Sequence, residues 1–159
     1  MGMTLGSIHF RGGLPKELRE DFPYRKERVD RTCLYDEGWE NQQLLQETAK
    51  RFSGLLHLPV LACYLWDEDT LVLTLYDGGQ RAAECMATIH DGIAGEPVHP
   101  AAMAAAFGID DPDGAALQKL MTDEDPDNPG DMMERIEALS AYFNFALVPD
   151  REISDRMYR

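Results

Sequence analysis

The chain has 159 residues, of which 44% are hydrophobic, and this length fits one domain with a hydrophobic core of its own. Fifteen basic residues stand against 29 acidic ones, giving a net charge of −14. The acidity begins after residue 35, because residues 1–35 carry seven basic and five acidic side chains. Such a surface repels nucleic acid and anionic membranes, and it attracts basic proteins.

The first strand is expected at Thr4–Phe10, before Gly12-Gly13, and a short helix at Leu14–Phe22. A second strand is expected at Val29–Tyr35. From Glu40 to Leu55 the apolar residues recur at helical spacing, which predicts an amphipathic helix.

The centre of the chain predicts a β-hairpin. Val60–Trp66 and Thr70–Tyr76 alternate in the manner of strands, and Asp67-Glu68-Asp69 between them forms the turn. A third strand from Gln80 to about residue 89 continues the hairpin into an antiparallel meander. Alternation places two sets of side chains on opposite faces. The aliphatic set, expected under helices, is Leu61, Cys63, Leu65, Leu71, Leu73 and Leu75, and the set expected to be half exposed is Ala62, Tyr64, Trp66, Val72, Thr74 and Tyr76.

The C-terminal part is expected to be helical, with helices from His99, from about Asp111 and from about Asp131. A polar tail is expected from about residue 150. The predicted fold is therefore a single α+β domain over residues 1–159, in which a mostly antiparallel sheet of about four or five strands carries packed helices.

The cysteines, Cys33, Cys63 and Cys85, lie in apolar runs and lack the paired spacing of a zinc ribbon or a redox site. We expect three buried thiols in place of a disulfide framework. The sequence has neither the pattern of a signal peptide nor an apolar run long enough for a membrane span, which predicts a cytoplasmic protein.

The stretch from Val29 to Phe107 resembles a group of small, poorly characterised bacterial α/β domains. The likeness rests on short motifs spread over about half of the chain. They are Tyr35-Asp36-Glu37 with Trp39, Ala49-Lys50-Arg51-Phe52-Ser53, Pro59-Val60, Trp66-Asp67-Glu68-Asp69, Gly79 after the returning strand, and Ala105-Ala106-Phe107-Gly108. Some of these domains resemble immunity proteins that block bacterial toxins, so the resemblance implies a partner-binding role.

An acidic loop near the C-terminus is a candidate calcium site, because its carboxylates follow the spacing of a helix–loop–helix calcium loop. The candidate ligands are Asp123, Asp125, Asp127, Asp131 and Glu134. Asn128 replaces the usual glycine of such a loop, and Gly130 replaces its apolar residue. The alternative is a solvated loop in which Asp131 caps the last helix. Calcium is the only cofactor that the sequence suggests.

No catalytic constellation stands out. The Asp67-Glu68-Asp69 cluster could hold a cation or perform acid–base chemistry in an uncharacterised hydrolase, but turn formation explains the same residues. Carboxylates and aromatic side chains next to this turn are typical of partner surfaces. The candidate contact residues are Tyr64, Trp66, Asp67, Glu68, Asp69 and Tyr76. The leading hypothesis is a non-enzymatic domain that binds a basic protein, with an immunity-type inhibitor as the expected role, and calcium-dependent regulation is the alternative.

Overall fold

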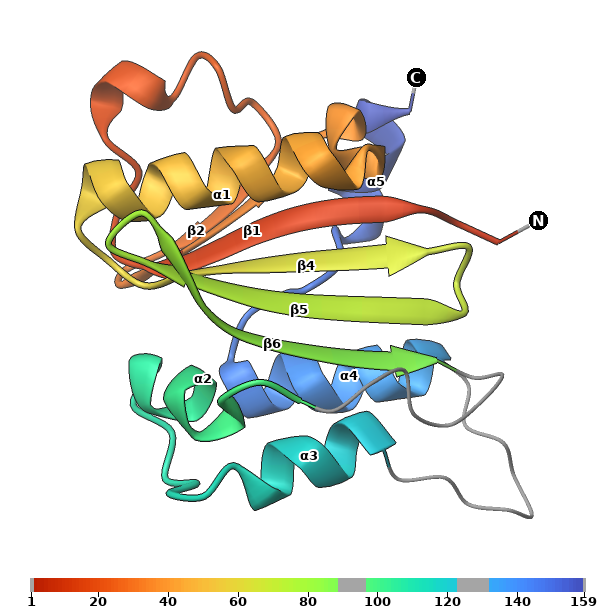
Figure 1. Cartoon of the computed structure of the whole chain (residues 1–159). Coiled ribbons are helices and arrows are strands. Elements are labelled where there is room, and N and C mark those ends of the chain that lie inside the picture. Colours follow the sequence, from red (N-terminus) through yellow and green to blue (C-terminus); the bar gives the residue numbers. More distant parts are fainter. Residues whose placement is uncertain (1, 89–96, 123–131, 159) are drawn as a thin grey trace.

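The computed structural model describes residues 2–88, 97–122 and 132–158. In those residues one antiparallel sheet has the strand order β2-β3-β1-β4-β5-β6 (Figure 1). The strands are β1 (Leu5–Arg11), β2 (Arg25–Arg28), β3 (Arg31–Tyr35), β4 (Val60–Trp66), β5 (Thr70–Asp77) and β6 (Gln80–Thr88). The helices are α1 (Gln42–Leu56), α2 (Pro100–Ala106), α3 (Ala115–Thr122), α4 (Met132–Phe143) and α5 (Arg151–Met157), with 3₁₀ turns η1 (Lys16–Leu18) and η2 (Glu37–Glu40).

The α+β class, the antiparallel sheet and the helical C-terminal part are confirmed. The described sheet has six strands, so the expected four or five was slightly low. The additional strand is β2, which reads Arg-Lys-Glu-Arg and pairs only with β3 at the edge of the sheet. Charged residues of this kind protect an exposed strand edge from pairing with other chains, and they hide the strand from an analysis of hydrophobic patterns.

Helices cover both faces of the sheet, with α1 on one side and α2, α3 and α4 on the other (Figure 1). Under α1, the residues Leu45, Ala49 and Phe52 face a core that includes Phe10 and Val60. On the opposite face, the C-terminal helices cover the predicted aliphatic set. That set, Leu61, Cys63, Leu65, Leu71, Leu73 and Leu75, is buried throughout, as predicted.

The other face of the hairpin was expected to be half exposed, and this prediction is wrong for most of its members. Tyr64, Val72 and Tyr76 are only 5–8% exposed to solvent, because they belong to the core cluster that α1 covers. Trp66, at the end of β4, stays 52% exposed. The face therefore closes along most of the hairpin and opens only near the β4–β5 turn.

Strand β1 lies in the middle of the sheet and contacts η2 through a glycine. A Cβ atom at Gly6 would lie 2.6 Å from both the Cβ and the carbonyl oxygen of Trp39. Only glycine allows such an approach of two backbone segments. Trp39 is 2% exposed, and its ring centroid lies 6.0 Å from that of Phe22.

Ser7 and His9 form a polar pair on the face of β1 that residues 145–147 cover. His9 is fully buried, and its Nε2 lies 2.8 Å from Ser7 Oγ. Because the Ser7 hydroxyl donates to the Leu147 carbonyl at 2.7 Å, it must accept the proton of His9 Nε2. The Tyr35 hydroxyl likewise donates to the Ala146 carbonyl. These hydrogen bonds hold residues 145–147 against the sheet.

Most of the expected polar tail forms helix α5. Asp150 accepts a hydrogen bond from the Ile153 amide at 2.9 Å and so caps α5. Ile153 and Met157, one turn apart, are buried against the core. Two apolar residues at helical spacing were too few for the sequence pattern to predict this helix.

Candidate functional site

The turn between β4 and β5 has a constrained backbone. Asp67 and Glu68 have φ values of 52° and 56°, in the left-handed region that favours glycine. The Asp69 amide closes the turn by donating to the Trp66 carbonyl at 3.1 Å. Positive φ at two central residues matches the twist of a hairpin, and it orients Trp66 at the end of the sheet.

N-terminal residues hold the same turn from the side. The Gly2 amide donates to Asp67 Oδ1 at 2.8 Å, and the Glu68 amide donates to the Met3 carbonyl at 2.9 Å. The Asp67 amide donates to Thr4 Oγ1 at 3.0 Å. The turn is therefore fixed by its own hydrogen bond and by three hydrogen bonds to residues 2–4, and a partner would meet a preorganised surface.

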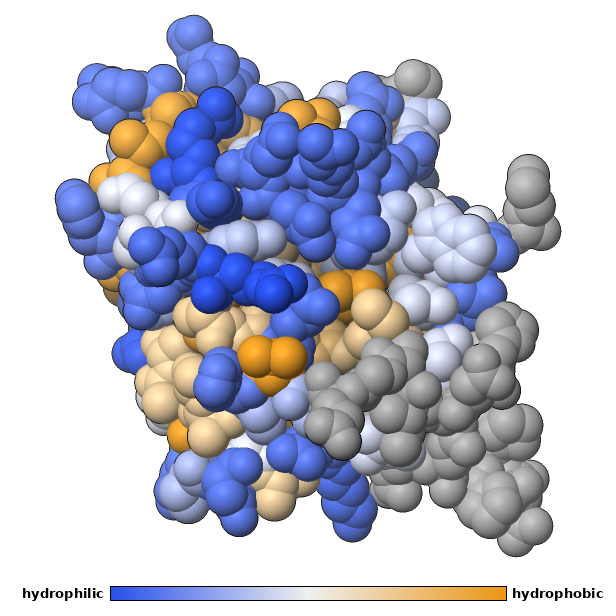
Figure 2. All heavy atoms as spheres, in the orientation of Figure 1, coloured by the Kyte–Doolittle hydropathy of each residue, from blue (hydrophilic) through white to orange (hydrophobic). Residues whose placement is uncertain are grey.

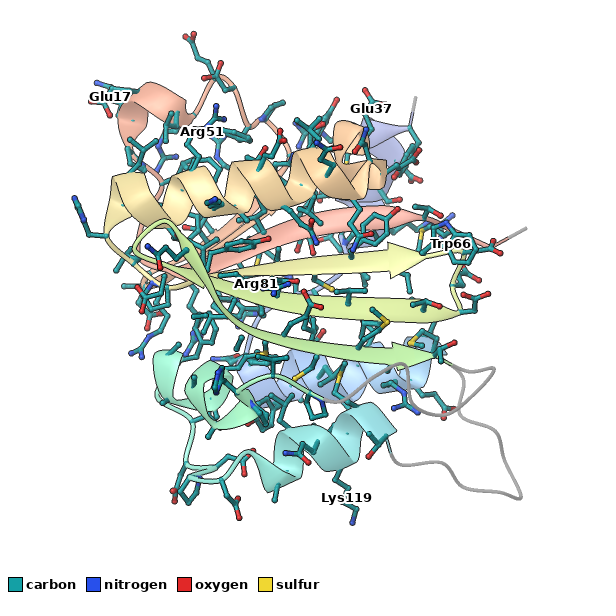
Figure 3. The ribbon with its side chains drawn as sticks, viewed as in Figure 1. Glu17, Glu37, Arg51, Trp66, Arg81 and Lys119 are labelled. Atoms are coloured by element: carbon teal, nitrogen blue, oxygen red, sulfur yellow. The ribbon has the colours of Figure 1, made fainter. Side chains whose placement is uncertain are left out.

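Beside this turn lies a hollow of about 320 Å³, which we call the Trp66 hollow. Its walls come from the start of α1 and from three adjacent strands. The lining residues are Gln42, Tyr64, Trp66, Thr70, Val72 and Met86. Figure 3 shows Trp66 at the end of β4, on the face of the sheet that carries α1.

The floor of the hollow is apolar with a polar margin. Tyr64 and Val72 pair directly across β4 and β5, and Met86 follows on β6. The Tyr64 hydroxyl donates to the Glu40 carbonyl at 2.7 Å. Burial, together with the negative charge of Glu40, raises the pKa of Tyr64 above its usual value. Tyr64 thus ties the floor of the hollow to the backbone of η2.

Further apolar residues lie at the β6 edge of the sheet. Val98, which is 46% exposed, pairs with Glu84 beside β6. In Figure 2 apolar residues gather in the middle of the viewed face, over β5, β6 and α2, with hydrophilic residues above them.

Two arginines lie far from the Trp66 hollow along the sheet. Arg51 and Arg81 lie at the end opposite Trp66, and Glu37 lies on the same side as Trp66 (Figure 3). Arg81 Nη1 pairs with Glu84 at 3.4 Å. None of the residues that line the hollow, all in the described part of the chain, is basic.

The structure separates the predicted contact residues into two groups. Trp66 and Glu68 are exposed, and Asp67 and Asp69 are half-buried at the turn. Tyr64 is buried in the floor of the hollow. Tyr76 pairs with Val60 at the far end of the hairpin, so it belongs to the core and not to the Trp66 surface. The alternation of the strands could not show that α1 covers Tyr76.

Sequence reasoning missed Gln42, Thr70 and Met86 as parts of the site. Gln42 is the first residue of α1. Met86 lies on the edge strand β6 and pairs with Val72 of β5. Thr70 sits opposite Trp66, and its hydroxyl donates to Asp69 Oδ1 at 2.9 Å. The register of the hairpin would have revealed that Thr70 lies opposite Trp66. The position of Gln42 beside the hollow depends on how α1 crosses the sheet.

A second hollow, of about 480 Å³, lies near the C-terminal end of α1 and includes Leu55, which is 61% exposed. Its charged residues are Glu47, Lys50 and Arg51, and its glycines are Gly54 and Gly79. It is larger than the Trp66 hollow, but it has mixed charge and no aromatic lining residue. The Trp66 hollow is the more specific candidate for recognition.

The buried side chains favour packing over chemistry. Desolvation raises the pKa of Cys63 to about 12 and that of Cys85 to about 11, and it raises the pKa of Cys33 as well. These thiols therefore stay protonated and are poor nucleophiles. The Ser7–His9 pair is completely covered, so a substrate could not reach it in this conformation.

Among the described residues, the structure does not bring together three or more metal-ligating side chains, at the Asp67-Glu68-Asp69 turn or elsewhere. Four of the predicted calcium ligands, Asp123, Asp125, Asp127 and Asp131, lie outside the described residues. Glu134 lies in the first turn of α4 and is exposed.

The calcium hypothesis stays a prediction that thermal melting can decide. If the loop binds calcium, millimolar calcium should raise the melting temperature, because a ligand of the folded state stabilises it. Glu134→Gln should remove this increase, since a calcium loop needs a bidentate carboxylate at its last position. An unchanged melting temperature at millimolar calcium would exclude the hypothesis.

No family model, curated protein or solved structure matches the chain. Along the described segments, the helices are too short or too polar to cross a lipid bilayer. Function must therefore be inferred from the geometry of the site.

Proposed function

We propose that this protein is a non-enzymatic, acidic binding domain that uses the Trp66 hollow and the neighbouring carboxylates to hold a basic partner protein. An immunity-type inhibitor of a basic toxin is the biological role that fits this activity. The observation that carries the proposal is the 52% exposed indole of Trp66, beside a hollow of about 320 Å³ on a hydrogen-bonded turn.

Physical reasons support this use of the surface. A tryptophan exposed on a rigid turn loses little conformational freedom on binding, and tryptophan is enriched among residues that dominate binding energy. Glu68 and Asp69 follow Trp66 in the β4–β5 turn, and Glu40 adjoins the hollow through its backbone carbonyl, which accepts from the Tyr64 hydroxyl. Acidic groups at the rim accelerate association with a basic partner and make the binding salt-dependent.

Capture of partners from the native cytoplasm tests the proposal, with the wild-type chain and Trp66→Ala as parallel baits. We expect Trp66→Ala to weaken capture of a basic partner at least roughly tenfold, which corresponds to about 1.4 kcal/mol. Capture by the wild type should fall when salt is raised, because screening weakens the attraction between the charged surfaces. Quantitative mass spectrometry measures both effects.

Leu55→Ala is the matched control, because Leu55 is as exposed as Trp66 but lines the other hollow. It should leave capture unchanged. Equal capture by wild type and Trp66→Ala, or the absence of any captured basic protein at low salt, would contradict the proposed function. Circular dichroism of each variant confirms that the fold is retained.

A further inference from the structure

We propose that the Trp66 hollow receives a single arginine side chain of the basic partner, with the guanidinium group stacked on the Trp66 indole. The inference rests on the proposed function, and it names the group that the site recognises. It is carried by the shape of the hollow, its lining and the sign of the charges around it.

The lining matches the two parts of an arginine side chain. Tyr64, Val72 and Met86 provide apolar contacts for the methylene stem. Trp66 provides an exposed aromatic surface at the mouth, where the charged head can remain partly in water. A volume of about 320 Å³ holds one long side chain, but it is too small for a whole helix or strand.

Acidic residues adjoin the lining of the hollow and could accept hydrogen bonds from a guanidinium group. Asp69 accepts from the Thr70 hydroxyl at 2.9 Å, which places its carboxylate beside a lining residue. Glu40 adjoins the floor, since its backbone carbonyl accepts from the Tyr64 hydroxyl at 2.7 Å. The Gln42 side chain adds an amide oxygen at the start of α1. An acidic or phosphate-bearing ligand would be repelled here.

Arginine fits this site better than lysine. Its planar guanidinium stacks on an aromatic face and can donate several hydrogen bonds in one plane. It is also more weakly hydrated than an ammonium group, so it loses less on entering an apolar hollow. The attraction between a cation and an aromatic ring is strongest when the ring is that of tryptophan.

Fluorescence of Trp66 provides the experiment. Trp39 is 2% exposed, so added peptide should affect mainly Trp66, and Trp66→Phe identifies its contribution. The probes are the blocked tripeptides Gly-Arg-Gly, Gly-Lys-Gly and Gly-citrulline-Gly, the last having the shape of arginine without its charge. We expect a saturable response to the arginine peptide in the millimolar range, roughly threefold or more weaker binding of lysine, and no saturation with citrulline.

Substitution of the acceptors gives an independent readout. Combining Glu40→Gln with Asp69→Asn should weaken binding of the arginine peptide about tenfold, because both changes remove charge with little change of shape. Glu47→Gln, in the Leu55 hollow, removes one acidic group elsewhere and should have no effect.

Equal binding of the three peptides, or unchanged binding after the Glu40 and Asp69 substitutions, would overturn the arginine inference. Loss of partner capture by Trp66→Ala would still support the proposed function in that case. Conversely, arginine binding without any Trp66-dependent capture of a protein would contradict the proposed function alone. The two proposals therefore fail separately.

Discussion

Trp39→Ala should lower the free energy of unfolding by about 3–5 kcal/mol, the range for removing a large buried aromatic side chain. Trp39 is 2% exposed and packs against Phe22 in the layer above the sheet. Its backbone also lies against Gly6 so closely that a methyl group there would collide with it. The surrounding segments cannot move inwards freely, so most of the cavity should remain. Urea unfolding followed by circular dichroism measures the change.

Trp66→Ala is the informative comparison, because it removes the same side chain from the surface. We expect it to change the free energy of unfolding by less than about 1 kcal/mol, since about half of the side chain is already in water. A loss of 3 kcal/mol or more at Trp66 would show that its role is structural and would weaken the binding proposal. A small loss at Trp39 would contradict the described packing of η2 on β1.

The second large expected effect is a loss of folding stability as the pH falls. Burial lowers the pKa of His9 to about 3, and its Nδ1 has no hydrogen-bond partner among the described residues. In the unfolded chain the same ring titrates near 6.5. The unfolded state therefore takes up a proton first as the pH falls. The contribution of neutral His9 to stability is complete above about pH 6.5 and is lost progressively between 6.5 and 3.

The slope in that window is about 1.4 kcal/mol per pH unit. Unfolding should therefore become easier by about 2 kcal/mol between about pH 7.5 and pH 5. His9→Phe should remove this pH dependence, while its own loss of the Ser7 hydrogen bond lowers stability at every pH. Urea titrations at both pH values measure the difference.

His57→Asn is the matched control. His57 is exposed at the end of α1 with a φ of 53°, which asparagine tolerates, so the variant should keep the pH dependence. If His9→Phe retains the wild-type slope between about pH 7.5 and pH 5, the titration belongs to another group.

The central hairpin was predictable because its signals are local. Two apolar runs, Val60–Trp66 and Thr70–Tyr76, joined by an acidic turn are sufficient to assign two strands, and the period of two along them gives their aliphatic face. The edge strand β2 was not predictable in the same way, because its stability comes from pairing with β3 and not from an apolar pattern. Helix α5 likewise depends on contacts with distant parts of the core.

The candidate site shows the same division. An exposed aromatic residue next to an acidic turn could be read from Trp66 and its neighbours. The exclusion of Tyr76 could not, because it depends on the part of the sheet that α1 covers. The hollow itself requires Gln42 and Met86, which are 44 positions apart in the chain, to meet on one face.

The strand order has a consequence for the exchange of amide hydrogens with solvent. Strand β1 hydrogen-bonds to both β3 and β4, so the sheet cannot open at its centre without separating segments far apart in sequence. Amides of β1 and β4 should therefore exchange only through global unfolding, whereas those of β2 exchange through local fraying at the edge. The N-terminal strand should be among the most slowly exchanging parts of the molecule.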